Sequence, residues 1–253
     1  MRSRLVRLLR AEGMTPTDRA TGSILSAMAD AGTFRLGGTI VGTNAFRLYE
    51  GELGIRLPLG GMANTGDIDI AQLEKLSVAL EDQVDPGLTE TFSALKFDPL
   101  PGLDPGRTWR WAQGRSGQLV EFLTPAFGKE TIRDLPALGV NAQALNYLNF
   151  VIAEPIHAAA IYRSGVLVQM PLPERYGIHK LIIADRRRDG AGSLKASKDR
   201  EQAAFLIEVM AEDRPDDLSR AYVTAMDVGP RWRENITNSL TRMPETMKIL
   251  NSM

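Results

Sequence analysis

The stretch Thr65–Ile70, TGDIDI, places two aspartates between isoleucines with one residue separating them. In a β-strand, successive side chains point to opposite faces, so Asp67 and Asp69 would share one face and Ile68 and Ile70 the other. The isoleucines could then enter a core, while the two carboxylates would repel each other unless a cation lay between them. Hard divalent cations such as Mg²⁺ prefer oxygen ligands, which predicts a metal site. A pair of solvated aspartates is the alternative, and the hexapeptide alone does not choose.

The composition is that of an ordinary soluble globular protein. The chain has 253 residues, of which 43% are hydrophobic and 24% charged, enough for one large domain or two modest ones. The net charge of −1 provides no overall attraction to nucleic acid or to a membrane. Any basic binding site must therefore be local.

Residue usage excludes several classes of site. The chain has no cysteine, which excludes disulfides, thiolate zinc sites and cysteine nucleophiles, and its two histidines, His157 and His179, are too few for a His-rich metal cluster. The first residues, MRSRLVRLLRAEG, lack the uninterrupted apolar region of a signal peptide. No segment has the apolar length of a membrane span. We expect a cytoplasmic protein without a membrane partner.

Periodicity predicts alternating helices and strands up to about residue 172. We expect helices at 15–31, 39–54 and 72–84, the first capped by Thr15 or Thr17, and strands at 33–38, 67–71 and 92–97. Two hairpins are expected, at 107–125 around the turn GRSG and at 157–171 with Ser164 and Gly165 in its turn.

Beyond residue 172 the pattern is helical throughout. A helix at 173–190 would begin with Pro and end at Gly, a second would cover 194–213, and two more would each begin with Pro. The sequence thus predicts an α/β (α+β) fold: a domain at 1–172 with a mixed sheet and flanking helices, followed by a helical domain at 173–253.

The glycine-containing segment RLGGTIVGTN, residues 35–44, is a second candidate for chemistry. Glycines after a strand let a backbone approach a phosphate, and the N-terminus of a following helix favours anions. A Walker A loop is excluded because Thr43 and Asn44 follow Gly42 where a Lys is required. A tight strand-to-helix turn without a ligand is the alternative.

The segments LGGT (36–39) and GDIDIA (66–71) together resemble the signature of the DNA polymerase-β-like nucleotidyltransferase superfamily. That signature is a hydrophobic residue, Gly-Gly or Gly-Ser, and then Asp-x-Asp or Asp-x-Glu between hydrophobic residues. The gap from Gly38 to Asp67, 29 positions, is longer than usual because of the insertion EGELGIRLPLGGMAN. The resemblance implies a third carboxylate on a later strand. Glu121, between Val120 and Phe122, matches it, and a solvated outward-facing glutamate is the alternative.

Two later segments, ERYGIHKLIIADRRR (174–188) and SKDREQ (197–202), are similar to motifs of bacterial nucleotidyltransferase-like proteins, including toxins of abortive-infection and toxin–antitoxin systems. In that group a helix supplies a Lys and, about two turns on, an Arg, and the next helix begins with Lys-Asp. The matching positions here are Lys180, Arg186 or Arg187, Lys198 and Asp199. Gln202 stands where those toxins usually carry a second acid.

The region 180–200 is locally basic, with seven Lys and Arg residues against three Asp residues. One interpretation is a clamp for a nucleoside triphosphate or an RNA backbone. The other is a solvated helix end whose arginines complement the helix dipole, which we expect of Arg188. Lys180 lies one turn before Ile183 and Ala184, so we expect it on the core side of its helix.

The resemblance implies transfer of a nucleoside monophosphate from an NTP to an acceptor hydroxyl, with release of pyrophosphate. It implies that Mg²⁺ or Mn²⁺ is held by Asp67, Asp69 and Glu121. The phosphates would be contacted by Gly37, Gly38, Thr39, Lys180, Arg186 and Lys198. Asp199 would orient or deprotonate the acceptor, and the helical domain would complete the active-site cleft.

The acceptor implied by the toxin-like motifs is a tRNA 3′ end or another RNA, and a cognate antitoxin is the implied protein partner. A protein hydroxyl or a small molecule such as an aminoglycoside is equally compatible with the motifs. Two further classes stay open: a non-catalytic binding module with the same fold, and a two-metal nuclease. The nuclease leaves the Gly-Gly-Thr turn without a role.

Overall fold

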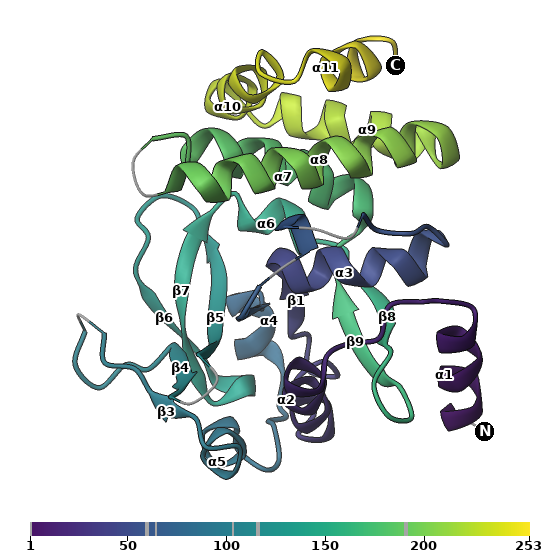
Figure 1. Cartoon of the computed structure of the whole chain (residues 1–253). Helices are drawn as coiled ribbons and strands as arrows, with labels where there is room; N and C mark the ends of the chain where they lie inside the picture. The colour runs from purple at the N-terminus through teal and green to yellow at the C-terminus, as the bar shows by residue number, and fades with distance from the viewer. Residues whose placement is uncertain (1, 59–60, 64, 103, 115–116, 190–191) are drawn as a thin grey trace. The chain divides into compact units, whose positions relative to one another are not determined.

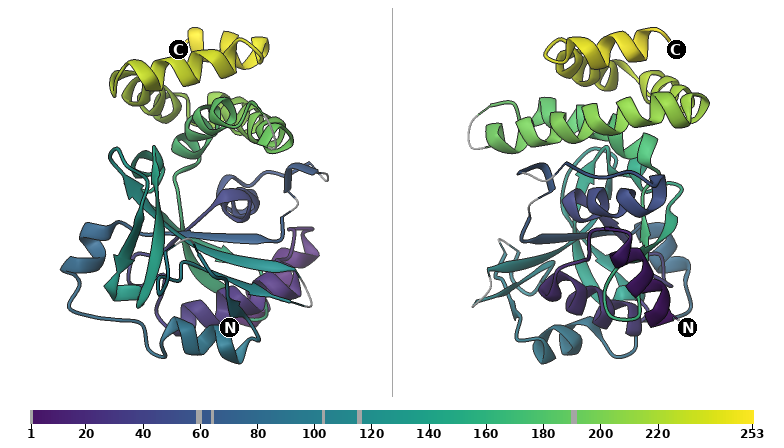
Figure 2. Two further views of the ribbon diagram at one scale, coloured as in Figure 1. Left: turned by 90° about the vertical axis from the view of Figure 1, so that its left-hand side faces the viewer. Right: turned by 45° about the vertical axis from the view of Figure 1, so that its right-hand side comes forward.

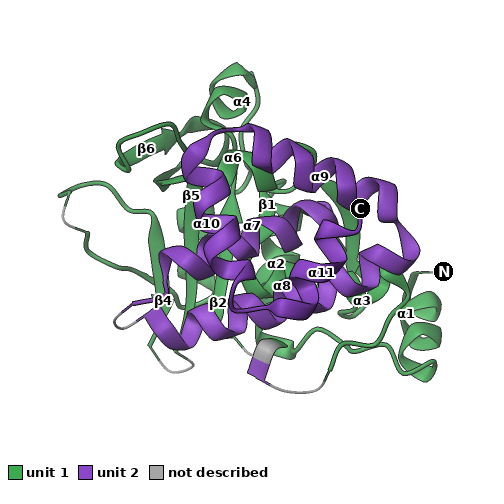
Figure 3. Cartoon of the chain, turned by 90° about the horizontal axis from the view of Figure 1, so that it is seen from above, with its two compact units in different colours: residues 1–58, 63–171 green, residues 59–62, 172–253 purple. Residues whose placement is uncertain are grey.

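The computed structural model describes residues 2–58, 61–63, 65–102, 104–114, 117–189 and 192–253. The chain divides into two compact units, coloured separately in Figure 3. Unit 1 comprises residues 1–58 and 63–171, and unit 2 comprises residues 59–62 and 172–253. Unit 1 contains the described strands, and the main body of unit 2 is helical.

A seven-stranded mixed sheet forms the centre of unit 1. Its main path is β1 (Thr39–Val41), β2 (Asp67–Ala71), β5 (Gln118–Ala126), β4 (Arg110–Gln113) and β3 (Asp98–Pro99). The second half of β5 pairs with β7 (Val140–Asn146), which also pairs with β6 (Ile132–Leu135), and Figure 1 shows β5 and β7 side by side. β2 and β5 are parallel, whereas β1 and β4 run antiparallel to these neighbours. The strands that carry the candidate acids are therefore adjacent.

The two predicted hairpins are confirmed. β4 and β5 pair antiparallel, although Arg115 and Ser116 of the predicted turn lie outside the described residues. β8 (Ile156–Ala160) and β9 (Val166–Met170) form a separate two-stranded antiparallel sheet.

The helices of unit 1 differ in part from the predicted ones. They are α1 (Arg2–Ala11), α2 (Arg19–Asp30), α3 (Gly42–Leu53), α4 (Glu74–Ala79), α5 (Leu88–Ala94) and α6 (Leu148–Val151), with short 3₁₀ turns η1 (Gly61–Ala63) and η2 (Pro136–Leu138). The predicted cap of α2 is wrong. Asp18 caps this helix, because its carboxylate accepts hydrogen bonds from the backbone N–H groups of Ala20 (3.1 Å) and Thr21 (2.9 Å).

Two predicted strands are also wrong. Residues 33–37 form turns rather than a strand. The segment 92–97 overlaps α5, which buries Leu88, Thr91 and Phe92, residues spaced by three and four positions as on one face of a helix. The helical spacing is not visible within residues 92–97 alone, because the helix begins at Leu88.

The core of unit 1 follows the alternation predicted for β2. Ile68 and Ile70 are buried, and so are their register partners Val120 and Phe122 on β5. The ring of Phe92 lies against this layer, with its centroid 6.0 Å from that of Phe122. The apolar residues of both strands thus face the core, which leaves the alternate positions for polar side chains.

Unit 2 is built around two long helices, α7 (Pro173–Arg186) and α8 (Ser193–Asp213), which pack together (Figures 1 and 2). α9 (Pro215–Asp227), α10 (Pro230–Leu240) and α11 (Pro244–Asn251) follow. Pro begins four of these helices, as expected where a missing N–H costs nothing. α7 ends at Arg186, and Gly190, its predicted end, lies outside the described residues. None of the helices in the described ranges is long and apolar enough to cross a membrane.

Candidate functional site

The three predicted carboxylates come together on one face of the sheet. In the parallel pair of β2 and β5, Asp69 lies opposite Glu121, and Asp67 lies opposite Leu119. Residues at one register position of adjacent strands point to the same face, so Asp67, Asp69 and Glu121 share a face. All three are partly exposed, while the alternate residues of both strands are buried. The resemblance to nucleotidyltransferases predicted these three acids, and the pairing of β2 with β5 makes them neighbours.

The register extends this row to both sides. Val41 of β1 lies opposite Asp69, and Arg110 of β4 lies opposite Glu121. Opposite charges at directly facing positions stabilise a sheet, so Arg110 offsets part of the repulsion among the acids. The guanidinium of Arg110 also lies over the ring of Trp109, 5.0 Å from its centroid.

The start of α3 lies against Asp69. Gly42, the first residue of the helix, has a φ of +65°, and an added Cβ there would lie 2.2 Å from Oδ2 of Asp69. The side chain of Asn44 donates to the backbone carbonyl of Asp67 (2.7 Å), which ties the helix start to β2. The N-cap residue Val41 makes no side-chain cap hydrogen bond. The N-terminus of a helix favours anions, and this one lies beside the acids.

The predicted order of strand, Gly-Gly turn and helix is wrong. The turn at Gly37 (φ +90°) and Gly38 precedes β1, and Thr39 is a buried residue of that strand. A Cβ on Gly38 would lie 2.8 Å from the carbonyl oxygen of Thr33, so this glycine allows close packing within the turn. The order in the structure is turn, strand and then helix, and the glycine at the helix start is Gly42.

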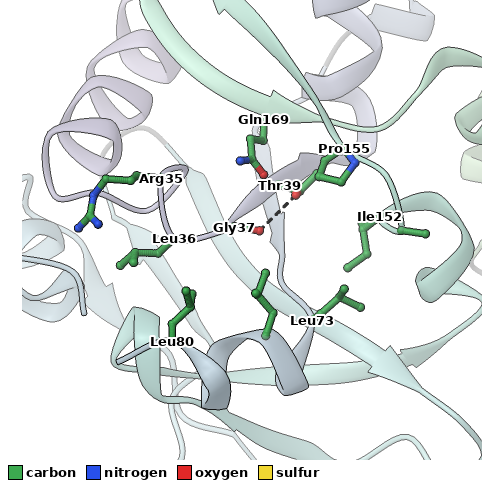
Figure 4. A pocket seen from close by; sticks show the side chains of 11 residues that line it. Arg35, Leu36, Gly37, Thr39, Leu73, Leu80, Ile152, Pro155 and Gln169 are labelled. Atoms are coloured by element: carbon green, nitrogen blue, oxygen red, sulfur yellow. Dashed lines mark hydrogen bonds between the residues drawn. The ribbon is translucent and has the colours of Figure 1, made fainter. Parts of the chain in front are cut away.

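Gly37 and Thr39 line an apolar pocket of about 280 Å³, shown in Figure 4. The hydroxyl of Thr39 donates to the carbonyl of Gly37 (3.3 Å). The lining is mostly aliphatic and includes Leu36, Leu73, Leu76 and Leu80, and none of the three acids contributes to it. Arg35 and Gln169 also line the pocket, and the contact of Gly37, Gly38 and Thr39 with phosphate stays a prediction.

Gly42 and Asn44 thus lie beside the acids, a position that the sequence patterns did not predict. A usable signal was present, because the run Thr39, Ile40 and Val41 is β-branched and favours a strand. Assigning these residues to a strand would have moved the start of the helix to Gly42.

The acids have the right chemistry for a hard cation, but their present side-chain positions do not form a ligand cage. In the ranges that the structure describes, no group of three His, Cys, Asp or Glu side chains is close enough to hold one ion. Asp69 and Glu121 stand at facing positions of neighbouring strands, which are about 4.8 Å apart. Mg²⁺ and Mn²⁺ prefer oxygen ligands, so the chemistry of this donor set, rather than its present geometry, suits either ion.

Within unit 2, the structure brings Lys180 together with Asp199. Nζ of Lys180 lies 2.5 Å from Oδ1 of Asp199, and Nη1 of Arg187 lies 2.8 Å from Oδ2. The side chains of Lys180 and Asp199 are 8% and 4% exposed, which confirms the predicted core-facing position of Lys180. Burial acts to raise the pKa of Asp199, but attraction and hydrogen bonds from Lys180 and Arg187 outweigh it and keep the pKa below its usual value. A carboxylate with a lowered pKa is a weak base.

The other basic residues of this region differ in role. Arg188 binds Asp185 (2.9 Å) and Asp189 (3.2 Å), as expected for an arginine at a helix end. Arg186 is exposed and Lys198 is partly exposed, so both are accessible to a polyanion. Burial and the charge of Lys180 lower the pKa of His179 to about 3, which keeps the imidazole neutral at pH 7.

Comparison with known proteins identifies a family. A family model described as nucleotidyltransferase matches residues 19–227. A crystal structure of an antigenic nucleotidyltransferase-like protein from Paracoccidioides brasiliensis is similar with a TM-score of 0.41 and 14% sequence identity, over 88% of this chain and 95% of that chain. A search of curated proteins found no match.

Proposed function

Because the chain belongs to the nucleotidyltransferase family, we propose that it transfers a nucleoside monophosphate from an NTP to an acceptor hydroxyl at Asp67, Asp69 and Glu121. These carboxylates would hold Mg²⁺ or Mn²⁺. When bound, such ions stabilise charge on the phosphates and lower the pKa of an attacking hydroxyl. The observation that carries the proposal is the register of β2 and β5, which sets Asp69 opposite Glu121.

The phosphates of the NTP would be held at the start of α3. Backbone N–H groups at a helix N-terminus bind phosphate oxygens, and Gly42 allows the backbone to lie directly beside Asp69. Contact of the phosphates with Gly37, Gly38 and Thr39, whose turn precedes β1, is the alternative that the sequence predicts. The phosphate site and the acids then belong to one connected piece of unit 1.

The basic residues of unit 2 form a separate part of the proposal. Lys180, Arg186 and Lys198 would bind phosphate groups of the nucleotide or of an RNA acceptor. We assign Asp199 to positioning rather than to proton transfer, because its carboxylate is already bound by Lys180 and Arg187. Its lowered pKa also makes it a poor general base at neutral pH.

An RNA 3′ end, and first of all that of tRNA, is the acceptor that we propose to test. The support for it is the basic character of residues 180–200, which suits a phosphate backbone. A protein hydroxyl and a small molecule are the alternative acceptors. An antitoxin partner is relevant only if the modification of tRNA proves toxic to a cell that expresses the chain.

The test is incubation with each α-labelled NTP and Mg²⁺ or Mn²⁺, in the presence of tRNA, total RNA or a protein extract. Asp69→Asn is compared with Asp98→Asn, which changes an exposed aspartate of β3 in the same sheet. We expect the native chain and Asp98→Asn to label one acceptor class and Asp69→Asn to lose orders of magnitude in rate. Equal labelling by Asp69→Asn would refute the site.

The remaining outcomes separate the alternatives. An NTP that binds without any labelled product identifies a non-catalytic binding module. A shortened RNA identifies a nuclease, because hydrolysis removes nucleotides and transfer adds them. Label in the protein extract alone, or in a small molecule recovered by chromatography, moves the acceptor from RNA to that class.

A further inference from the structure

Helix α1 carries exposed apolar side chains on a strongly basic helix. Leu5, Leu8 and Leu9 are 52%, 51% and 39% exposed, and Val6 is the buried residue of the helix. The spacing of the three leucines, by three and by one, places them on one stripe. The helix also contains Arg2, Arg4, Arg7 and Arg10 and no acidic residue. The whole chain has a net charge of −1, so this positive charge is a local feature.

Val6 and Arg10 attach α1 to the rest of unit 1. Val6 packs at the turn between β8 and β9, where a Cβ added to Gly165 would lie 3.6 Å from Cγ2 of Val6. Nη2 of Arg10 donates to the carbonyl of Ile161 at 3.5 Å, a long hydrogen bond. Figure 1 shows α1 beside this hairpin. The helix is thus held by its Val6 edge, and the leucine stripe faces solvent.

A groove of about 600 Å³ next to α1 is lined by polar, charged and apolar residues. Arg2 and Arg35 contribute positive charge to its lining, and Phe34 and Leu167 contribute apolar surface. Leu167 is 65% exposed. Asp30 is the acid in this lining, and Arg35 shares its charge with Asp82 outside the groove. Asp30 and Asp82 thus offset the charge of the groove, so the basic character belongs to α1, and the exposed Leu167 continues the apolar surface onto the body of unit 1.

We propose that α1 binds the protein to an anionic lipid surface. The leucine stripe would enter the boundary between headgroups and acyl chains, and the arginines would pair with lipid phosphates. RNA would neutralise the arginines but would leave the leucine stripe in water. A lipid surface satisfies both features along the whole helix. The prediction of no membrane partner rested on the lack of a spanning segment and on the net charge of −1. A helix that lies in the membrane interface needs neither a spanning segment nor a basic chain.

The experiment measures partition of the full chain onto vesicles of phosphatidylcholine alone and of phosphatidylcholine with about 30% phosphatidylglycerol. Leu5→Asn/Leu8→Asn removes exposed apolar groups, and Val223→Asn is its control on an exposed position of α9. Arg4→Glu/Arg7→Glu reverses charge, and Arg231→Glu/Arg242→Glu is its control, since both arginines are exposed.

We expect binding to the anionic vesicles only. Each α1 double variant should lose about tenfold or more in partition coefficient, while the controls retain it. Binding should weaken at 0.5 M salt because screening reduces the attraction between the arginines and the lipid. Circular dichroism should be unchanged in all variants, because the altered side chains are exposed.

Four results would overturn the proposal. They are no vesicle binding by the native chain, equal binding to neutral vesicles, full binding by Leu5→Asn/Leu8→Asn, and full binding by Arg4→Glu/Arg7→Glu. Gel-shift titration with tRNA and sedimentation velocity identify the occupant in that event. Loss of tRNA binding in the arginine variant would assign α1 to RNA, and loss of a dimer in the leucine variant would assign it to a second copy. Vesicle binding requires no catalysis, so this test is independent of the proposed transferase activity.

Discussion

A Cβ added to Gly42 would lie 2.2 Å from Oδ2 of Asp69, which means that the backbone at the start of α3 is packed directly against a carboxylate of the candidate site. Glycine is needed here for two reasons: the space is taken by the carboxylate, and the φ of +65° is unfavourable for other residues. In the proposed site, a change in the backbone at Gly42 would therefore move the carboxylate of Asp69.

Replacing Gly42 with Ala should abolish nucleotide transfer while leaving the fold intact. The methyl group must displace the carboxylate of Asp69, and we expect a loss of at least about a hundredfold in rate, in line with misplacement of a group by about 1 Å. The conformational strain should cost about 1–2 kcal/mol. Gly54→Ala is a matched control, because Gly54 follows the other end of α3, has a φ of +66° and has nothing within 4 Å of its added Cβ. Equal activity of the two variants would show that contact with Asp69 is unimportant.

Glu121→Gln tests the candidate acid whose assignment has the least specific support in the sequence. If Glu121 holds the same cation as Asp69, the variant should lose orders of magnitude in transfer rate, because a neutral amide supplies less charge. Glu90→Gln, at an exposed position of α5, is the control. Retention of full activity would instead make Glu121 a strand residue that balances Arg110 across the sheet.

The aromatic cluster around Phe92 should dominate the stability of unit 1. This ring is fully buried, and its centroid lies 5.2 Å from that of Trp111 and 6.0 Å from that of Phe122. Phe92→Ala should lower the free energy of unfolding by about 3–5 kcal/mol, measured by urea titration. Phe127→Ala removes an equal volume at a position that is 82% exposed and should change the free energy by less than about 0.5 kcal/mol. A small effect at Phe92 would contradict the packing described.

The buried pair of Lys180 and Asp199 should make unit 2 sensitive to acid. The pKa of Asp199 is lowered on folding, so its stabilising effect is complete above the unfolded value of 3.8 and is lost as the pH falls through the folded-state pKa. At pH 7, Asp199→Asn should cost about 3–5 kcal/mol because it leaves Lys180 buried without its partner. The difference between native chain and variant should shrink below pH 4.

Asp189→Asn is the matched control for this measurement, since its side chain is 87% exposed and binds Arg188 at the surface. We expect no measurable change in unfolding from this variant at either pH. A difference between the native chain and Asp199→Asn that stays constant from pH 7 to pH 3 would show that the ionised form of Asp199 is not what stabilises the unit.

The cap of α2 gives a direct test of a corrected prediction. Asp18→Ala should lower stability by about 1 kcal/mol, because two backbone N–H groups lose their acceptor. Thr17→Ala should have little effect, since Thr17 is held through its backbone N–H, which donates to the carbonyl of Ile161. Urea denaturation of the two variants shows whether Asp18 or Thr17 caps the helix, because the variant that lacks the cap is the less stable one.

Local patterns were sufficient for several elements. The alternation in DIDIA predicted β2 with its core-facing isoleucines, and Pro at helix starts marked α7, α9 and α10. They failed where short windows were ambiguous: residues 92–97 seemed extended in isolation but belong to the helical period that begins at Leu88. Helical and extended patterns cannot be separated over so few residues.

The sequence by itself determined which residues could act, because two aspartates in an apolar strand and a basic Lys-containing helix are properties of the chain. The tertiary structure alone decided which glycine lies beside the acids. Gly37–Gly38 and Gly42 each suit a turn beside a phosphate, and which of them lies near the acids depends on the pairing of β1 with β2, which sets Val41 opposite Asp69. That pairing joins residues 28 positions apart, and strand pairing over such distances is set by burial and backbone hydrogen bonding across the whole sheet rather than by local preference.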